Sequence, residues 1–509
     1  MKCFSSSQIR QLDSITSKRE SLSSIDLMER AGRALSLRIE EIVPQKAQVA
    51  VLVGPGNNGG DGMVIARQLH QQGYRVQVVL CNYGKVVSPD ATFQLKQLQQ
   101  VKGVNVISPT TAEELNHRVH ADWLVDALFG TGLNRPLMGA FEETVEWINR
   151  QQAGCISIDL PSGLFGEDNS KREDTTIVRA AITLGLQCPR LAFFLAENEA
   201  FIGKWELINI GLNKEALRQL ETPWSLTTPE EVALLLKKRR HFAHKGQFGH
   251  TLLIAGSRGM TGACILAGRG ALRAGTGLLT LKVPDGCLNI VQTALPEAMA
   301  KTYTHSFWDE TDHIDTWTGI AVGPGLGTAE NTGEALDRLF SQQPKRLVLD
   351  ADALNVMALK RTLLEKIPVN AILTPHPGEF DRLTKPHKTG FERLQTAIEF
   401  TNHYGVYLIL KGAYSACIAP QGTCRFNLTG NPGMATGGSG DVLTGIVVSL
   451  LSQGYTHEEA CIVGTCLHGL SGDLALDNES QESLLASDIA ANLGNAFRYL
   501  KKTAHTETV

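Results

Sequence analysis

The sequence predicts an α/β protein of two successive domains. Strand-like and helix-like segments alternate along the chain, and this alternation starts afresh near residue 250. Short apolar runs that end in Gly, Asp or Pro are typical of buried parallel strands, and the longer periodic runs between them are typical of helices. A chain of 509 residues is also too long for a single hydrophobic core. We therefore expect two mostly parallel sheets, each with helices on both faces.

The first half contains the expected strands and helices in regular alternation. Residues 48–54 (QVAVLVG) predict a buried strand, and residues 62–73 predict the helix after it. A second strand and helix are expected at 74–81 and 88–100. Two further strands, at 121–130 and 154–161, have exits rich in glycine or proline.

The join between the halves lies near residues 212–245, where the apolar periodicity fades. Thr228, Pro229 and Glu231 supply a helix N-cap, a first-turn proline and a capping-box acid, so a helix should begin at residue 229. Because that helix fits the second half, we place the domains at residues 1–222 and 223–509.

In the second half the same alternation resumes. A small-residue helix is expected at 261–275, and three helices should close the chain at 441–453, 457–476 and 487–501. The expected strands lie within residues 250–256, 319–325, 346–352, 370–377 and 406–412.

Composition narrows the class of protein. The chain is 43% hydrophobic and 20% charged with a net charge of −4, whereas a nucleic-acid-binding protein would be expected to be basic. No run of about 18 apolar residues could span a membrane, and the start, MKCFSSSQIRQLD, lacks a signal-peptide core. The ten cysteines form no CxxC pair. We expect buried, reduced thiols in a cytoplasmic protein.

The most informative motif is NPGMATGGSGD at residues 431–441, which runs directly into the apolar helix VLTGIVVSLL. Its glycines 437, 438 and 440 can present bare N–H groups at the helix start, which is an anion site. Asp441 sits beside that site. A carboxylate next to a phosphate is useful if it moves a proton on a group that reacts with the phosphate. The motif therefore predicts nucleotide-dependent chemistry on a hydroxyl.

The first half carries a different glycine motif, GPGNNGGDG at residues 54–62. It contains G-x-G-x-x-G, but the next strand ends in VVLCN without the acid that a dinucleotide fingerprint requires. A conventional NAD-dependent dehydrogenase is therefore disfavoured. Asn57, Asn58 and Asp61 offer oxygen ligands and amide donors. The alternative is a glycine turn whose asparagines tolerate left-handed angles.

Two aspartates interrupt apolar strands of the first half. Asp126 and Asp159 each need a partner or a cation if they are buried. Together with Asn58 and Ser162, Asp126 could bind a hard monovalent or divalent cation through oxygen. Each aspartate taken alone could instead cap a helix.

Strand exits of the second half also carry polar residues. Gly323, Gly325 and Gly327 allow a ligand to approach the backbone closely, and His376 sits between two prolines on a stiff turn. Residues 411–415 place an ammonium, a glycine and a hydroxyl at another exit, which suits a nucleotide. The alternatives are a solvent-facing histidine and a solvated lysine. Asp350 and Asp352 could help to hold Mg²⁺ or could cap a helix.

These motifs, in this order and spacing, resemble the bifunctional NAD(P)H-hydrate repair enzymes. GPGNNGGDG, DALFGTGL and IDLPSG are similar to the epimerase half, and the opening SSQIRQLDSITSKRESLSSIDLMERAG resembles the helical N-terminus of that half. HKGQFGHTLLIAGSRGMTGACILAGRGALRAGTG, GPGLG, LDADALN, LTPHPGEFDRL, LKGAYS and GMATGGSGDVLTG are similar to the dehydratase half. The resemblance covers nearly the whole chain. It implies an N-terminal Rossmann-like three-layer epimerase domain followed by a C-terminal ribokinase-like dehydratase domain.

For the first domain the resemblance implies interconversion of the R and S forms of hydrated NADH or NADPH. Asp159 would touch the substrate as the acid/base. A potassium ion would be held by Asn58, Asp126 and Ser162. The remaining implied substrate contacts are Asn57, Gly59, Gly60, Asp61, Gly130, Thr131, Gly132, Leu133, Asn134, Arg135 and Pro136, together with Asn58.

For the second domain the resemblance implies dehydration of the S hydrate at the expense of ADP or ATP with Mg²⁺. Asp441 would take the proton of the ring hydroxyl while the hydroxyl accepts a phosphoryl group, because phosphate leaves far more easily than hydroxide. The implied hydrate contacts are Ala263, Gly325, Gly327, His376 and Asp441. The implied nucleotide contacts are Lys411, Gly412, Ala413, Tyr414, Ser415 and Gly440.

The second half alone would also suit a ribokinase-like small-molecule kinase fused to a dinucleotide-binding domain. One departure from the family is Gln187, near a position where a lysine is common. The expected partners are small molecules only, with neither nucleic acid nor membrane. Helices rich in alanine and glycine can pack between subunits or within one, and our working expectation is a homo-oligomer.

Overall fold

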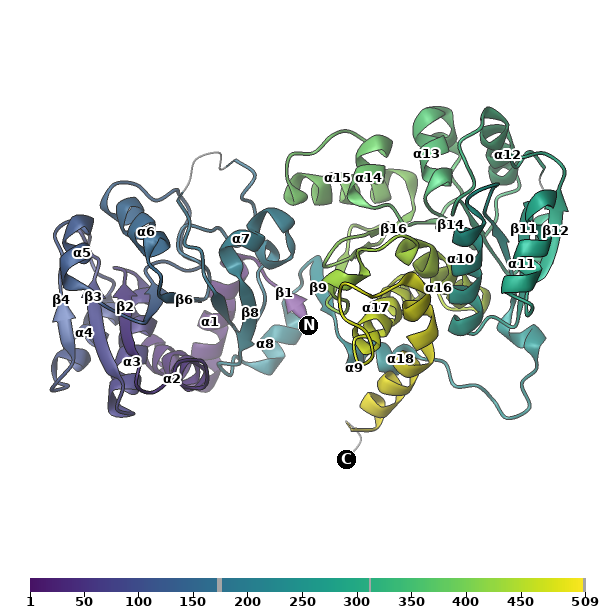
Figure 1. Ribbon diagram of the computed structural model, residues 1–509. Helices are drawn as coiled ribbons and strands as arrows, with labels where there is room; N and C mark the ends of the chain where they lie inside the picture. The colour runs from purple at the N-terminus through teal and green to yellow at the C-terminus, as the bar shows by residue number, and fades with distance from the viewer. Residues whose placement is uncertain (172–175, 311–312, 507–509) are drawn as a thin grey trace. The chain divides into compact units, whose positions relative to one another are not determined.

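The computed structural model describes residues 1–171, 176–310 and 313–506 (Figure 1). The chain divides into two compact units. The first is mainly Lys2–Thr222, and the second mainly Pro223–Lys388 and the residues from Glu392 onward. Each unit is built on its own sheet, so the predicted fold class of two α/β units is confirmed.

The sheet of the first unit is entirely parallel, with the order β4-β3-β2-β5-β6-β7-β8. The strand order reverses at β2, which lies between β3 and β5, and ligands bind at such a switch point in open α/β sheets. The strands are β2 (Gln48–Val53), β3 (Arg75–Leu80), β4 (Asn105–Ile107), β5 (Trp123–Ala127), β6 (Gly154–Ile158), β7 (Ile182–Leu186) and β8 (Lys204–Ile208). The short β1 (Lys2–Cys3) precedes them in the chain and does not belong to this sheet.

Alternating side chains of β2 divide the core of this unit. Val49, Val51 and Val53 pack with the helices of one face, whereas Ala50 and Leu52 pack with those of the other. The first face is covered by α2 (Ser24–Ile42), α3 (Asn57–Gln71) and α4 (Pro89–Gln99), and the second by α5 (Leu115–Arg118) and α6 (Ala140–Arg150) (Figure 1). The remaining helices are α1 (Ser6–Glu20), α7 (Glu199–Ile202) and α8 (Lys214–Gln219).

The sheet of the second unit is mixed. Its strands run in the order β9-β18-β17-β16-β15-β14-β13-β10-β11-β12, parallel from β16 to β12, with the β16–β17 and β17–β18 pairs antiparallel. The strands are β9 (Trp224–Thr227), β10 (His250–Ile254), β11 (Leu278–Pro284), β12 (Met299–Tyr303), β13 (Gly319–Val322), β14 (Leu347–Leu349), β15 (Ile372–Leu373), β16 (Tyr407–Leu410), β17 (Ala416–Ile418) and β18 (Cys424–Asn427).

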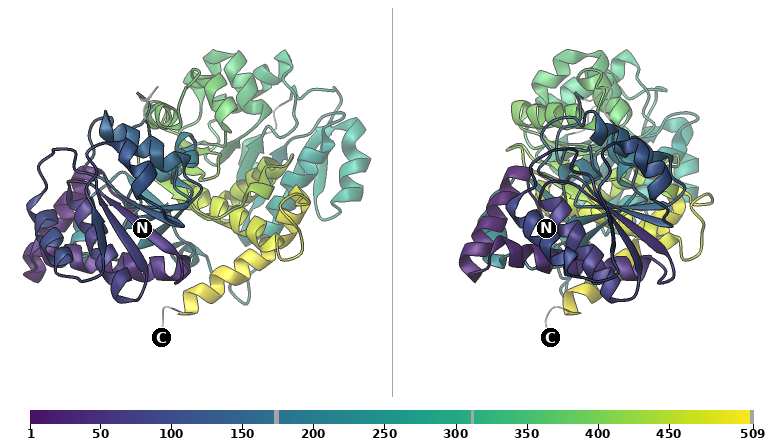
Figure 2. Two further views of the ribbon diagram at one scale, coloured as in Figure 1. Left: turned by 60° about the vertical axis from the view of Figure 1, so that its left-hand side comes forward. Right: turned by 90° about the vertical axis from the view of Figure 1, so that its left-hand side faces the viewer.

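Helices cover both faces of this second sheet, as the turned views also show (Figure 2). Helices α12 (Glu330–Ser341), α13 (Asp352–Leu359) and α14 (Pro377–Leu383) lie on the opposite side from α16 (Ser439–Ser452), α17 (His457–Ala475) and α18 (Ala486–Thr506) (Figure 1). The others are α9 (Pro229–Leu235), α10 (Thr261–Ala274), α11 (Leu288–Ala294) and α15 (Gly390–Tyr404).

Helices α10 and α16 pack unusually closely because glycines face one another's backbone. A Cβ atom on Gly445 would lie 1.9 Å from the carbonyl oxygen of Ala267, and one on Gly270 would lie 2.5 Å from that of Val442. The small-residue face of α10 is therefore used within its own unit and lends no support to the expected homo-oligomer, which stays a prediction.

Several local predictions are confirmed. Thr228 and Glu231 form the capping box that starts α9, and all ten cysteines are buried free thiols. No helix among the described residues combines the length and the apolar composition that a membrane span requires. Two boundaries were wrong: α3 begins at Asn57, inside the glycine motif, and not at residue 62, and α18 ends at Thr506 and not at residue 501.

Candidate active sites at two sheet edges

In the first unit, the glycine motif allows three chain segments to meet at the carboxyl edge of the sheet. A Cβ atom on Gly54 would lie 1.9 Å from the carbonyl oxygen of Leu128, and one on Gly59 would lie 2.0 Å from that of Gly54. No residue from Asn57 to Asp61 has a positive φ, so the alternative of a left-handed asparagine turn is wrong. The glycines serve close backbone approach at the start of α3.

Gly130 brings two predicted substrate residues together. A Cβ atom there would lie 2.8 Å from Oδ2 of Asp159 and 3.0 Å from Oδ1 of Asn58. The next backbone N–H, that of Thr131, donates to Oδ2 of Asp159 over 2.8 Å. Asn58, Gly130, Thr131 and Asp159 therefore form one site at the switch point, between the exits of β2, β5 and β6.

Sequence reasoning missed Arg190, which follows β7. Its guanidinium donates through Nη2 to Oδ1 of Asp159 over 2.6 Å and through Nη1 to the carbonyl oxygen of Cys188 over 2.6 Å. Only 1% of the Arg190 side chain is exposed. Asp159 itself has φ +67°, a strained conformation for a non-glycine residue. An arginine inside the apolar run LQCPRLAFF was the signal available in the sequence.

Two further acids lie near Asp159. Asp61 is buried on α3, and burial, Asp159 and Asp13 raise its pKa well above the usual range. Asp13 of α1 was not singled out from the sequence. Burial raises the pKa of Asp13 to about 6, with Arg190 opposing the rise and Asp159 adding to it.

Asp126 and Ser162 meet in a fully buried network. Ser157 Oγ and Ser162 N each donate to Oδ2 of Asp126 over 2.8 Å, while Ser162 Oγ donates to Oδ1 over 2.6 Å. The N–H of Leu128 also reaches Oδ1, over 3.3 Å. Burial raises the pKa of Asp126, and these hydrogen bonds oppose the rise.

Other predicted residues of the first unit lie at the rim of this site or outside it. Gly132, Asn134, Arg135 and Pro136 are exposed in the loop after β5, with Leu133 half-buried. The carboxamide of Asn57 accepts from Ser88 Oγ over 2.8 Å. Gln187 accepts the N–H groups of Ile210 and Leu212 and so has a structural partner of its own.

In the second unit, Asp441 lies in the first turn of α16, half-buried beside the glycine motif. Gly438 has φ +92° at the N-cap, a conformation that favours glycine. Burial and the nearby Asp350 raise the pKa of Asp441 to about 7, although Lys411 opposes the rise. The group therefore titrates near neutral pH.

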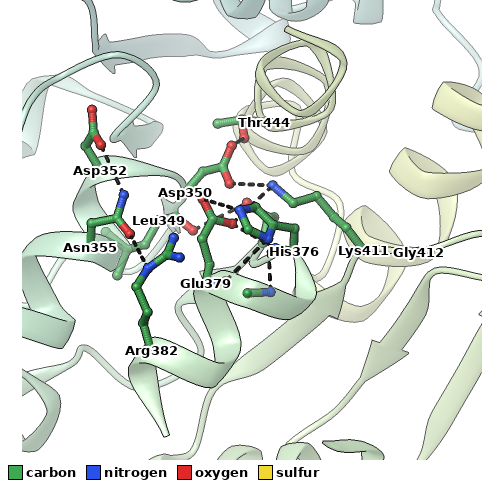
Figure 3. A network of polar contacts seen from close by, with 12 residues as sticks. Leu349, Asp350, Asp352, Asn355, His376, Glu379, Arg382, Lys411, Gly412 and Thr444 are labelled. Carbon is green, nitrogen blue, oxygen red and sulfur yellow. Dashed lines mark hydrogen bonds and ion pairs between the residues drawn. The ribbon is translucent and has the colours of Figure 1, made fainter. Parts of the chain in front are cut away.

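Lys411 is the centre of a polar network at the exits of β14, β15 and β16 (Figure 3). Its Nζ atom lies 2.9 Å from Oδ1 of Asp350 and 3.7 Å from Oε2 of Glu379. Thr444 Oγ1 donates to Oδ2 of Asp350 over 2.6 Å and ties the network to α16. Burial lowers the pKa of Lys411, but the two carboxylates outweigh it, so the pKa is raised.

This network brings the two predicted nucleotide elements together. A Cβ atom on Gly440 would lie 3.2 Å from Nζ of Lys411. Residues 411–415 form the turn between β16 and β17, in which Ser415 Oγ donates to the carbonyl oxygen of Gly412 over 3.2 Å. Gly412 and Ala413 are exposed, and Tyr414 is half-buried.

The predicted hydrate residues lie at the exits of three strands. Gly325 adjoins Ala263, since a Cβ atom on Gly325 would lie 3.0 Å from that of Ala263. The N–H of Gly327 donates to Asp352 over 2.8 Å. Asp350 and Asp352, the possible Mg²⁺ ligands, therefore already have protein partners.

His376 caps α14 with half of its side chain exposed. Its Nδ1 accepts from the N–H groups of Gly378 over 3.1 Å and Glu379 over 3.4 Å, and its own N–H donates to Glu379 over 2.8 Å. Nδ1 is thus an acceptor, which leaves the ring proton on Nε2. His468, also missed, is half-buried on α17, and its Nε2 lies 2.9 Å from the carbonyl oxygen of Ser439.

Comparison with known proteins gives a consistent result for both halves. Residues 24–192 match the family model of the YjeF-related protein N-terminus, and residues 251–495 match that of NAD(P)H-hydrate dehydratase. The bifunctional NAD(P)H-hydrate repair enzyme Nnr of Moorella thermoacetica is 33% identical, over 99% of this chain and 98% of its own length. That of Escherichia coli is 30% identical, over 92% and 88%.

Two of the solved structures that match each cover about half of this chain. The ADP/ATP-dependent NAD(P)H-hydrate dehydratase from Bacillus subtilis, co-crystallised with ATP and Mg²⁺, is 32% identical with a TM-score of 0.47. The match extends over 54% of this chain and over 98% of the Bacillus subtilis chain. A ribokinase-like superfamily protein from Enterococcus faecalis is 25% identical with a TM-score of 0.48, over 56% and 98%.

Proposed function

This chain belongs to the family of bifunctional NAD(P)H-hydrate repair enzymes, and on that premise we propose that it repairs hydrated NADH and NADPH in two steps. The first unit, residues 1–222, interconverts the R and S hydrates. The second unit, residues 223–509, dehydrates the S form at the expense of ADP or ATP. The observation that carries this proposal is that one chain holds both a dinucleotide-type switch-point site around Asp159 and a glycine-rich helix start bearing Asp441.

In the first unit, Asp159 is the acid/base. It receives the Arg190 guanidinium on one oxygen and the Thr131 N–H on the other, which is the environment of a fixed carboxylate. Inverting the hydrated ring carbon requires a proton to leave its hydroxyl and later to return. The hydrated dinucleotide lies along residues 57–61 and 130–136 in this proposal, beside Asp159.

Potassium in the first unit is a separate part of the proposal. Asn58, Asp126 and Ser162 offer oxygen atoms as potassium ligands, and they come from three strand exits. Nδ2 of Asn58 is buried without a hydrogen-bond partner among the described residues. An amide turned by 180° would present its oxygen there instead. Each Asp126 oxygen already accepts two hydrogen bonds, so a cation would compete with the Ser162 hydroxyl for this carboxylate. When bound, potassium would fix the loops around the substrate.

In the second unit, Asp441 accepts the proton of the ring hydroxyl as that oxygen attacks the terminal phosphoryl group of the nucleotide. A pKa of about 7 suits a general base at neutral pH. Gly440 and the start of α16 offer N–H groups to the transferring phosphoryl group, and Lys411 adds a positive charge beside them. The contacts to the hydrate come from Ala263, Gly325, Gly327 and His376.

A magnesium ion would accompany the nucleotide. The carboxylates of Asp350, Glu379 and Asp441 outnumber the single ammonium of Lys411 in their surroundings, so the site accommodates a further cation. Magnesium prefers oxygen ligands and commonly binds through nucleotide phosphates. It would neutralise charge on those phosphates. We also place the enzyme in the cytoplasm, since ten buried free thiols suit a reducing compartment.

The test is recovery of reduced nicotinamide absorbance from an epimer mixture of NADH hydrate with K⁺, Mg²⁺ and ADP or ATP. Complete recovery with consumption of one nucleotide phosphoryl group per NADH supports both activities. Recovery that stops when the S form is exhausted contradicts the epimerase assignment. A stable phosphorylated product without NADH would favour a kinase instead.

A further inference from the structure

Helix α1 presents one buried face, and an aspartate lies within it. Ile9, Leu12 and Thr16 are buried at spacings of three and four residues, which places them on one side of the helix. Asp13 comes four residues after Ile9 and three before Thr16, so it belongs to the same side. It is half-buried, unlike its fully buried neighbour Leu12.

Contacts at both ends hold α1 in place over the exit of β7. Ser6 donates from its backbone N–H and its hydroxyl to Oε1 of Glu167, over 2.5 and 3.0 Å. At the other end, the N–H of Asn213 donates to Thr16 Oγ1 over 3.0 Å. Between them, Ile9 and Leu12 pack in one apolar cluster with Cys188. The carbonyl of Cys188 is the group that holds Arg190.

Asp13 therefore faces the charged residues of the epimerase site. Arg190, Asp159, Asp61 and the Cys188 thiol are the titratable groups that interact with it electrostatically. No hydrogen bond or ion pair engages its carboxyl within residues 1–171, 176–310 and 313–506. Asp13 is half-buried, so its carboxyl is partly withdrawn from water without gaining a hydrogen bond, which leaves it available to a ligand.

We propose that Asp13 is the second proton-transfer residue of the epimerase site and works together with Asp159. The inference rests on the proposed function of the first unit. The Asp159 carboxylate takes the proton of the ring hydroxyl. The bond between the hydroxyl-bearing carbon and the ring nitrogen then breaks, and its electron pair goes to the nitrogen. Asp13 gives its proton to this nitrogen, and the carbon becomes an aldehyde. Rotation of the aldehyde and the reverse steps return both protons and give the other epimer.

Two acids are available for the second proton, and their surroundings separate them. Asp61 is buried on α3, where burial raises its pKa well above the usual range, whereas Asp13 is half-buried. Burial, only partly offset by Arg190, raises the pKa of Asp13 to about 6. Reversible epimerisation needs a group that both gives and takes a proton, and a pKa near the working pH favours this. Arg190 serves as a positioning residue for Asp159.

The region of chain that carries Asp13 lies outside the matched family model, which begins at residue 24. The site therefore includes a segment that the family model does not describe. The full-length protein contains an internal control. Helix α1 belongs to the first unit, so a variant of Asp13 should leave the dehydratase activity of the second unit unchanged.

The experiment compares the full-length protein with Asp13→Asn, Asp13→Glu and the control Glu20→Gln, which removes a charge at the far end of the same helix. Epimer exchange of NADH hydrate is followed by NMR, and dehydration of the pure S form by absorbance. We expect Asp13→Asn to lower kcat for exchange by about 10²- to 10⁴-fold, the range typical of a lost general acid or base, with KM nearly unchanged. Asp13→Glu should retain part of the exchange activity that Asp13→Asn loses, and Glu20→Gln should exchange epimers as fast as the unchanged protein.

The pH dependence of epimer exchange distinguishes a proton-transfer role of Asp13 from a structural one. Asp13→Asn should remove the dependence on a group with a pKa of about 6. Wild-type kcat in Asp13→Asn would overturn the inference, as would a parallel fall in Tm and in both activities. If the unchanged protein fails to exchange epimers at all, the proposed function of the first unit fails, and this is seen before any variant is compared.

Discussion

Lys411 and Asp350 form an ion pair of 2.9 Å at the exits of two strands, with Asp350 only 1% exposed. The pair is joined to α16 through Thr444, one turn from Asp441. A buried carboxylate thus holds an ammonium beside the helix start where a phosphate would bind. The same carboxylate raises the pKa of the neighbouring Asp441, so positioning and acid/base tuning have one source.

Asp441→Asn should abolish dehydration and leave epimer exchange intact, because it removes the proton acceptor of the second site alone. We expect a loss of at least about 10²-fold in kcat, the usual contribution of a general base. Steady-state dehydration of the S hydrate is the measurement. The matched control is Asp337→Asn on α12, whose carboxylate pairs with Lys366 at the surface. Dehydration retained in Asp441→Asn would remove Asp441 from the mechanism.

The rate of dehydration should fall below pH 7. Asp441 must be ionised to accept a proton, and its pKa is raised to about 7, so the rate rises with pH through that value. Below it, kcat/KM should drop about tenfold for each pH unit. Replacing Asp350 by Asn removes a negative charge that raises the pKa of Asp441. The fall of kcat/KM on the acid side of the pH profile should therefore move to lower pH. A limb that stays in place in Asp350→Asn would show that another group controls the profile.

The same raised pKa makes a prediction about stability. A carboxyl whose pKa is higher in the folded state favours folding when protonated, and that contribution is lost as the pH rises through about 7. Asp441→Asn should therefore be more stable than the unchanged protein at pH 8, by a few degrees in Tm, and nearly equal at pH 4. Calorimetry at the two pH values checks this. An equal Tm at pH 8 would mean that the site relieves the charge in another way.

Which features could be predicted from the sequence depends on how far apart the interacting residues are. The capping box of Thr228 and Glu231 is local and was found. Lys411 and Asp350 lie 61 residues apart, yet both end strands of a parallel sheet, so the strand pattern alone placed them at one edge. Asp13 and Arg190 were missed because no spacing within their own runs of sequence singles them out. Their relation to Asp159 depends on how α1 packs over the exit of β7, which no local pattern records.

Potassium should matter to the first unit only. Replacing K⁺ by tetramethylammonium, which is too large for an oxygen site between Asn58 and Ser162, should slow epimer exchange severalfold or more. Dehydration of the pure S hydrate in the same solutions is the control. Asn58→Ala should lower both the exchange rate and its response to K⁺. Equal exchange in both salts would leave Asn58, Asp126 and Ser162 as a structural network.

Close packing of α10 against α16 gives a prediction that is independent of chemistry. A methyl group on Gly445 would lie 1.9 Å from the carbonyl oxygen of Ala267, and backbone cannot yield as a flexible side chain can. Gly445→Ala should therefore cost at least about 1–3 kcal/mol, the usual cost of overpacking a core. Gly494→Ala on α18 is the matched control, because nothing lies within 4 Å of its added methyl group. That change should stabilise by up to about 1 kcal/mol through helix propensity. Urea unfolding of the two variants measures both effects.

Since α16 also carries Asp441, Gly445→Ala should lower the rate of dehydration as well. A fully stable Gly445→Ala protein would mean that the two helices can move apart at little cost.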